Sequence, residues 1–553
     1  MRLFVALSIP LGLALVATSR EAPSRRERAR PPEVQSADEL TARIDAALTA
    51  HWPAAGVTPR PPADDLAFAR RLWLDLLDTV PSLQELRELE ARPAAGRREW
   101  LVDRALGDPR FHHAFASRLV RVVVGDDSKV DDLLYRRRKL VSWMASELAR
   151  HRPWDELARE LIAAEGISTA HAPVNFVLAQ EKDPIKLAAR TTRAFLGVRI
   201  DCAQCHDHPF NDWKQEQFHG LAAFFARFDQ DIKGVRERPT GEYYLEPGGT
   251  ATVRPDEPKV QAIGSGAPAM GMNMAGEGGG AGPAPRRIAP GVPVHPELLP
   301  PDQSHRRRAL AAWVTHAENP WFARAIANRL WGWLLGQGFV DPPDELDVAT
   351  PRAPEVLELL ARDLVAHRFQ LERTVRAIVL SRAYGLGSRG ASPEVLAAWA
   401  AFPLKQLTAA QLGAAALQTT SFWTYDERRA QLVRLAHFGD LNDFVRRHGE
   451  DPGVESPEAE SLLQRLHLMN GEKLRERTKS DDIFGPVTRL PALTRTPQAA
   501  IEAAFLMTLG RRPTPREAEH FAGELQAAGD ERGAVMSDLL WALVNSTEFA
   551  WNH

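Results

Sequence analysis

Residues 64–77 read DDLAFARRLWLDLL, a pattern typical of an amphipathic helix. The apolar side chains recur at helical spacing, with arginine and aspartate between them. Prolines at positions 61 and 62 precede the segment, and acidic residues occupy its first turn, as is common where a helix begins. Similar patterns continue along most of the chain, so the sequence predicts a mainly α-helical fold.

Composition excludes several classes of protein. The 553 residues are 44% hydrophobic and 25% charged, close to globular averages, which excludes a mainly disordered chain, a collagen-like fibre and a polytopic membrane protein. Lys and Arg number 69 against 72 acidic residues, and the net charge of −3 predicts no general affinity for nucleic acid or anionic membrane. Two cysteines are too few for a disulfide framework.

The N-terminus resembles an export signal. Met1-Arg2 gives a short positive start, an apolar run follows from Leu3 to Ala17, and small residues at 17–19 suit a signal peptidase. Residues 1–19 are therefore predicted to be a signal peptide and residues 20–36 a flexible spacer. An uncleaved anchor is the alternative. In either case we expect a periplasmic or cell-surface protein with no other transmembrane span.

The mature chain divides into two predicted helical domains, residues 37–230 and 303–553. Residues 231–302 separate them, and 22 of the 55 residues between positions 247 and 301 are Gly or Pro, which indicates a linker or long loop. Residues 242–245 and 251–253 flank a Pro-Gly-Gly and predict a small β-hairpin. The acidic segment 341–347, DPPDELD, predicts a turn and helix cap.

Both cysteines lie in one motif, Cys202-Ala203-Gln204-Cys205-His206. C-x-x-C-H is the attachment signature of a c-type haem. The two thiols add across the vinyl groups on one porphyrin edge, and His206 is then placed to be the proximal ligand of the iron. The leading hypothesis is therefore a haem c protein that transfers electrons, with a redox partner protein, or senses through its haem.

Other chemistry remains possible at this motif. Cys202, Cys205, His208 and His219 could together bind zinc or iron, since two thiolates and two imidazoles suit a tetrahedral site. Such a metal would stabilise a scaffold that binds a partner protein or a surface polysaccharide. A redox-active disulfide is a third interpretation. Methionines at 270, 272 and 274 are candidates for a distal haem ligand, although tolerated loop residues are the simpler explanation.

The motifs of common enzyme classes are missing from the sequence. It contains no P-loop, no G-x-G-x-x-G, no H-E-x-x-H and no G-x-S-x-G. Enzymatic activity therefore stays an open question at this point. An enzyme that acts on an extracellular polymer is the least favoured hypothesis, because no pair of carboxylates suited to acid/base catalysis is evident.

Several segments carry a resemblance to a known family. Residues 194–227 contain AFLGV, CAQCHDHPF and LAAFFAR, and residues 319–331 contain NPWFAR and NRLW. Residues 378–382 read IVLSR, and residues 539–549 contain LLWALVNS and EF. These segments resemble the planctomycete cytochrome-like proteins, in which a cytochrome-type domain of unknown function precedes a planctomycete-specific C-terminal domain. The resemblance, over roughly residues 44–553, implies a large exported helical protein and no particular reaction.

Overall fold

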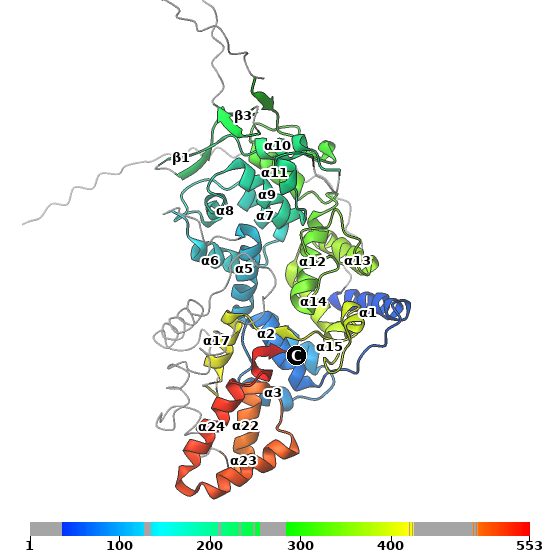
Figure 1. Cartoon of the computed structure of the whole chain (residues 1–553), viewed down its shortest axis with the longest axis vertical. Coiled ribbons are helices and arrows are strands. Elements are labelled where there is room, and N and C mark those ends of the chain that lie inside the picture. The colour runs from blue at the N-terminus through cyan, green and yellow to red at the C-terminus, as the bar shows by residue number, and fades with distance from the viewer. Residues whose placement is uncertain are drawn as a thin grey trace, which may run out of the picture. The chain divides into compact units, whose positions relative to one another are not determined.

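The computed structural model describes residues 36–125, 134–207, 212–231, 234–246, 249–254, 284–419 and 496–553, with positions 421, 422, 424, 490 and 494. Helices dominate these residues, which confirms the mainly α-helical fold that the sequence predicts (Figure 1). The predicted signal peptide, His208 and the three loop methionines lie outside the described residues.

The helices of the two halves begin and end mostly where the sequence pattern predicts. Those before the Gly/Pro-rich segment are α1 (Ala37–Ala54), α2 (Asp65–Leu77), α3 (Leu83–Glu90), α4 (Arg97–Leu106), α5 (Pro109–Val124), α6 (Arg137–Leu148), α7 (Trp154–Ile162), α8 (Asn175–Ala179), α9 (Pro184–Thr191) and α10 (Gln215–Ala223). Those after it are α11 (Arg306–Val314), α12 (Phe322–Leu335), α13 (Pro354–Ala366), α14 (Leu371–Leu380), α15 (Arg382–Gly385), α16 (Pro393–Ala397), α17 (Ala409–Gln418), α22 (Pro497–Leu509), α23 (Pro515–Ala527) and α24 (Arg532–Val544).

Side-chain caps explain several helix starts. Asp64, the residue before α2, accepts a hydrogen bond from the Ala67 amide at 2.8 Å. A hydroxyl or carboxylate in this position satisfies an amide that has no partner within the helix. At α23 Thr514 and Glu517 form a reciprocal capping box.

The strands are short and form three small sheets. The predicted hairpin is confirmed as β3 (Glu242–Leu245) paired antiparallel with β4 (Ala251–Arg254). The remaining strands are β1 (Phe228–Asp231) with β2 (Gly234–Glu237), β5 (Arg286–Ile288) on the other edge of β3, and β6 (Lys405–Gln406) with β7 (Trp551–Asn552). These additional pairings depend on contacts between segments whose own sequences carry no strand pattern.

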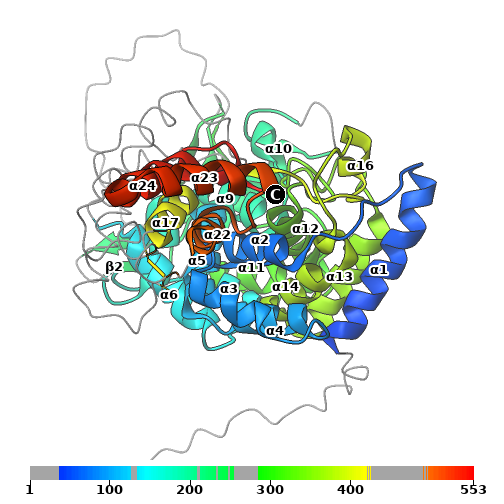
Figure 2. The same ribbon diagram turned by 90° about the horizontal axis from the view of Figure 1, so that it is seen from below.

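The two predicted helical domains share one hydrophobic core. One cluster of buried apolar side chains runs from Leu40 to Phe402 and includes Leu506. Helix α1 packs against α13 and α14 (Figure 2), and the Trp52 indole donates a hydrogen bond to the Ala398 carbonyl at 3.0 Å. Residues 35–553 accordingly form one compact unit. The apolar face of α1 is covered by helices from the other half, which local sequence does not reveal.

A second core lies under the C-terminal helices. Side chains of α17, α22, α23 and α24 form this cluster together with Leu74 from α2. Arg70, which is fully buried, donates to the carbonyls of Thr508 at 2.7 Å and Phe549 at 3.0 Å. The C-terminal residues are thereby attached to α2, more than four hundred positions earlier in the chain.

The buried carboxylate of Asp75 joins four parts of the fold. It accepts hydrogen bonds from the Lys405 ammonium at 2.6 Å, the Asn552 amide at 2.9 Å and the Tyr384 hydroxyl at 2.9 Å. Burial lowers the pKa of Lys405 to about 8, against the opposing effect of the Asp75 charge. Asp75 is only 3% exposed, so hydrogen bonds from protein donors take the place of those that the carboxylate would form with water.

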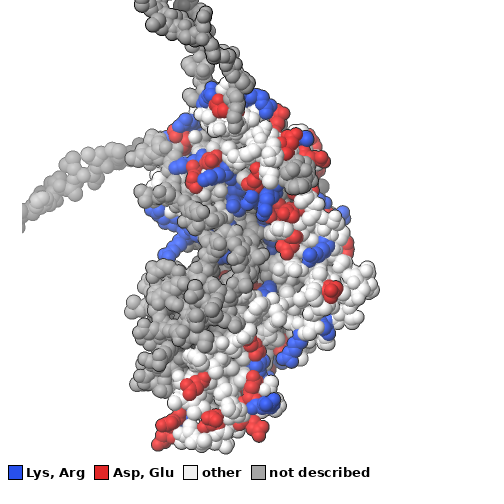
Figure 3. All heavy atoms as spheres, viewed as in Figure 1, with Lys and Arg blue, Asp and Glu red and all other residues white. Residues whose placement is uncertain are grey.

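Within the described residues, no helix combines the length and the apolar character needed to cross a bilayer. On the face shown in Figure 3, basic and acidic side chains lie in several mixed groups, with surface formed by other residues between them. This mixture agrees with the near-neutral net charge of the sequence.

Candidate functional site

The cysteine motif occupies a single 3₁₀ turn, Asp201–Gln204, followed by Cys205 and His206. Both cysteines are free thiols and both are exposed. The side chain of His206 is exposed as well. The turn thus presents two thiols and an imidazole at the surface, while the intervening Ala203 is buried and attaches the turn to the core.

A glycine directs the chain from α9 into this turn. After α9 the backbone forms a π-helical turn, Thr192–Leu196, and Gly197 ends it with φ of +64°. That left-handed conformation favours glycine. A Cβ atom at position 197 would also lie 2.6 Å from the Leu346 side chain and 3.0 Å from the Pro343 carbonyl oxygen, so a larger residue would require its neighbours to shift.

The acidic segment 341–347 supports the chain on either side of the motif. Its backbone pairs with the preceding residues, and the Leu346 amide donates to the Gly197 carbonyl at 3.0 Å. Asp344 forms an ion pair with Arg199 at 2.8 Å, and Asp347 accepts from the Trp213 indole at 2.5 Å. The sequence predicted a turn and helix cap here. The structure contains the turn, and its carboxylates bind residues flanking the motif instead of capping a helix.

His206 is oriented by its own neighbour. Its Nδ1 lies 2.7 Å from the backbone carbonyl of Asp207. A carbonyl only accepts hydrogen bonds, so Nδ1 carries the proton in this arrangement. Nε2 is then the basic nitrogen, and among the described residues it has no hydrogen-bond partner. Metal-binding histidines commonly have one ring nitrogen fixed in this way.

Gln215, the first residue of α10, forms hydrogen bonds with the backbone of the turn and with Asp207. The Gln215 side chain donates to the Cys205 carbonyl at 2.9 Å and to the Gln204 carbonyl at 3.2 Å. The backbone N–H of Gln215 donates to the Asp207 carboxylate at 3.0 Å. This hydrogen bond, together with the one from Lys214, lowers the pKa of the Asp207 carboxyl. These contacts hold the backbone of the motif while leaving the thiols exposed.

His219, a candidate metal ligand from the sequence, is buried beneath the turn. Its Nε2 lies 3.0 Å from the Gln204 carbonyl and its Nδ1 lies 2.8 Å from the Tyr243 hydroxyl. The carbonyl requires a proton on Nε2, so Nδ1 accepts from the hydroxyl and the ring is neutral. Burial lowers the pKa of His219, which favours this neutral form. With both ring nitrogens engaged, His219 holds the motif through the Gln204 carbonyl.

The zinc or iron site considered from the sequence is not assembled in the described part of the chain. No three His, Cys, Asp or Glu side chains come together there in a metal-binding arrangement. Cys202 and Cys205 lie on the turn, His219 is engaged elsewhere, and His208 lies outside the described residues.

Acidification should weaken the support that His219 gives to the turn. The pKa of His219 is lower in the folded protein than in the unfolded chain, where it is about 6.5. The unfolded state therefore binds more protons as the pH falls, so this contribution to stability is complete above about pH 6.5 and is lost as the pH falls through the folded pKa.

Urea unfolding between about pH 7 and pH 5 measures this loss. The wild type should become less stable towards pH 5, and His219→Gln should lose part of that dependence. His520→Gln, at an exposed position on α23, is the control and should behave as the wild type. An unchanged pH dependence in His219→Gln would contradict the buried neutral imidazole.

The supporting residues were not apparent from the sequence. Gln215 and Tyr243 carry no motif, and Tyr243 reaches the site only because β3 packs against α10. The apolar side chains around His219, among them Phe218, Leu221 and Phe225, are buried. A histidine within such a buried stripe was the one signal that could have indicated a positioning role.

Two parts of the chain match known family models. Residues 43–230 match PSCyt2, described as a protein of unknown function (DUF1549). Residues 306–428 match PSD1, described as a protein of unknown function (DUF1553). Both matched domains have unknown function. Their order is the one that the planctomycete resemblance implied, and the PSCyt2 match contains the whole cysteine motif. No curated protein and no solved structure matches the chain.

Proposed function

We propose that this chain is an exported c-type haem protein that transfers electrons or senses through its haem at the cell envelope. The observation that carries the proposal is the pair of free, exposed thiols, one on the 3₁₀ turn and one directly after it, followed by an exposed histidine. The name of the matched family, PSCyt2, is consistent with a cytochrome-like protein.

The residues of the turn fit a covalently attached porphyrin. Cys202 and Cys205 would form the two thioether bonds, and His206 would bind iron through Nε2 while Nδ1 donates to the Asp207 carbonyl. When bound, the haem would supply one-electron redox chemistry. His219 and Gln215 would keep the motif backbone in one conformation. They would thereby fix the surroundings that set the reduction potential of the haem.

The intact mass of the denatured protein tests the proposal. We expect the wild type, produced in cells with active cytochrome c maturation, to carry the mass of one haem. The Cys202→Ser/Cys205→Ser variant should carry no haem mass. Only a haem that is attached through thioether bonds stays on the chain after denaturation, and this variant cannot form them. The His219→Gln variant should still be modified, since its thiols are intact.

Elemental analysis of the same samples separates the alternative. Stoichiometric zinc or non-haem iron in a protein without added haem mass would contradict the haem proposal and support the metal-stabilised scaffold. Loss of folding on chelation would then be expected.

A further inference from the structure

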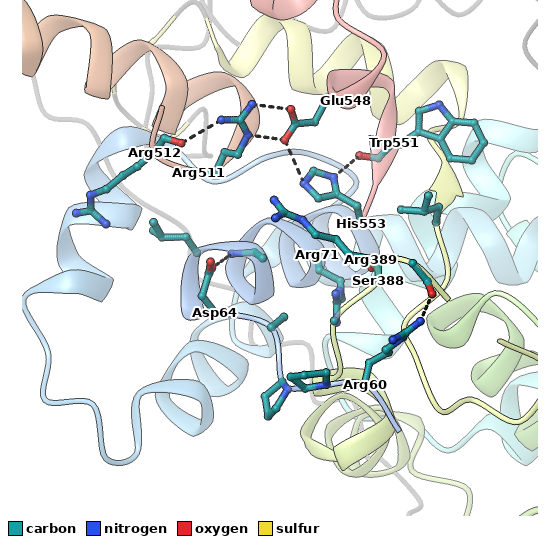
Figure 4. A pocket seen from close by; sticks show the side chains of 18 of the residues that line it. Arg60, Asp64, Arg71, Ser388, Arg389, Arg511, Arg512, Glu548, Trp551 and His553 are labelled. Carbon is teal, nitrogen blue, oxygen red and sulfur yellow. Dashed lines mark hydrogen bonds and ion pairs between the residues drawn. The ribbon is translucent and has the colours of Figure 1, made fainter. Parts of the chain in front are cut away.

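A cavity of about 1030 Å³ lies where three distant parts of the chain meet (Figure 4). Its walls come from residues 60–64 before α2, from the loop 387–390, and from residues 511–514 with the C-terminal segment. No residue of the cysteine turn lines it. We propose that this cavity binds a small ligand through a carboxylate, sulfate or phosphate group attached to a ring, independently of the proposed haem.

The cavity has an excess of positive charge. Arg60, Arg71 and Arg389 line it, and none of them forms an ion pair with a carboxylate among the described residues. Arg60 donates to the Gly390 carbonyl, and Arg71 donates to the carbonyls of Tyr384 and Leu386. Carbonyl groups satisfy donors without neutralising the charge.

The other two arginines of the wall, in contrast, are neutralised by ion pairs with glutamates. Arg511 forms ion pairs with Glu517 at 2.9 Å and with Glu548 at 2.6 Å. Arg512 is paired with Glu90 and Glu502. Asp64 also lines the cavity, and it caps the Ala67 amide. Asp64 thus lines the cavity without a hydrogen-bonded ion pair, as do three arginines, of which Arg71 interacts electrostatically with Asp64 and with the buried Asp75.

Arg71 is the strongest sign of a missing anion. The residue is 1% exposed, and its guanidinium carbon lies 3.4 Å from the centroid of the Phe402 ring. Its Nε is buried with no hydrogen-bond partner, as are the Nε of Arg60 and the hydroxyl of Ser388 in the same wall. A buried cation with an unused donor is costly unless an acceptor of opposite charge completes it. An oxyanion in the cavity would supply this charge through the charge-assisted hydrogen bonds that arginine forms best, although the Nε of Arg71 itself lies beneath the cavity surface.

Two helix starts also border the cavity, and each already has an acidic partner. Asp64, the residue before α2, caps the Ala67 amide, and Thr514, the residue before α23, forms a capping box with Glu517. The positive charge of the cavity therefore comes from its arginines.

The remaining wall indicates a ligand with a ring. Pro61, Pro62, Leu404 and Trp551 border the cavity, and Leu404 is 56% exposed. The proline rings and the exposed Leu404 give this wall an apolar surface, which suits a sugar or another flat, partly apolar body. The volume is at the upper end of the range for small-molecule pockets, so it accommodates one or two rings beside the anionic group.

Isothermal titration calorimetry on the full chain tests the proposal with glucuronate, glucose 6-sulfate, glucose 6-phosphate, inorganic sulfate and neutral glucose. At least one of the three anionic sugars should bind, with an affinity that falls as salt is added. Glucose should bind at least about tenfold more weakly. Which anionic sugar binds most tightly then identifies the oxyanion.

Matched variants locate the binding. Arg389→Gln and Arg60→Gln should each weaken it by about tenfold or more. Arg87→Gln removes an exposed arginine that pairs with Glu90 and Glu502 but does not line the cavity, and it should bind as the wild type. No binding of any anion at about 10 mM, equal binding of glucose, or full affinity in both cavity variants would overturn the proposal. Inorganic sulfate that binds as tightly as the sugar esters would overturn the ring part of it.

Discussion

Replacing Asp75 by alanine should lower the free energy of unfolding by about 3–5 kcal/mol. The carboxylate is 3% exposed and accepts hydrogen bonds from Lys405, Asn552 and Tyr384. Its removal leaves the Lys405 ammonium buried, with only the carbonyls of Trp333 and Leu334 as partners. The charge then lacks a counterion in a largely buried region, where the Lys405 side chain is only 16% exposed, and this accounts for the large effect.

Urea unfolding monitored by circular dichroism measures this loss. Asp103→Ala is the matched control, because Asp103 forms an exposed ion pair with Arg376. It should cost no more than about 1 kcal/mol. If the two variants were equally stable, the Asp75 carboxylate would not hold the N-terminal and C-terminal parts of the fold together as described.

Replacing Glu242 by glutamine should also cost about 3–5 kcal/mol. Glu242 is buried on β3 and accepts from Arg306 at 2.8 Å, Arg227 at 2.8 Å and Arg287 at 3.2 Å. Burial alone raises the pKa of this carboxyl, but hydrogen bonds from the arginines lower it overall. Glutamine keeps the shape and removes the charge, so the buried Arg306 loses its counterion.

The effect of Glu242→Gln should extend to the cysteine turn, because the next residue on β3, Tyr243, holds His219. Glu246→Gln provides the control at the other end of the strand, where the carboxylate pairs with Arg254 and is partly exposed. We expect unfolding of that variant to match the wild type. An equal loss of stability in both variants would contradict the claim that the burial of Glu242 makes its ion pairs important for the free energy of unfolding.

The helices were predictable because their signals are local. Asp64 before α2 and Thr496 before α22 cap helices whose apolar spacing is evident in the sequence. The hairpin β3–β4 has a local signal too, in its Pro-Gly-Gly connection. The pairing of Lys405 with Asn552 has none, because segments of two residues are too short to show an alternation of polar and apolar side chains.

The candidate site was predictable in its chemistry and not in its support. C-x-x-C-H is a contiguous motif, so the thiols and His206 could be named from the sequence. Their surroundings come from Tyr243 and from the segment 341–347, which the chain brings together only through tertiary packing. The cavity near Arg71 is beyond local reasoning for the same reason, since its walls lie at positions far apart in the chain.

The alkaline pyridine haemochrome spectrum of the purified wild type tests the central claim most directly. It distinguishes a haem held by two thioether bonds from one that keeps a free vinyl group. We predict a c-type α-band for the wild type, a band shifted towards that of a singly attached haem for Cys202→Ser, and no covalent haem when both cysteines are replaced. A wild type without any c-type band, produced in cells whose maturation machinery modifies a control cytochrome, would contradict the account.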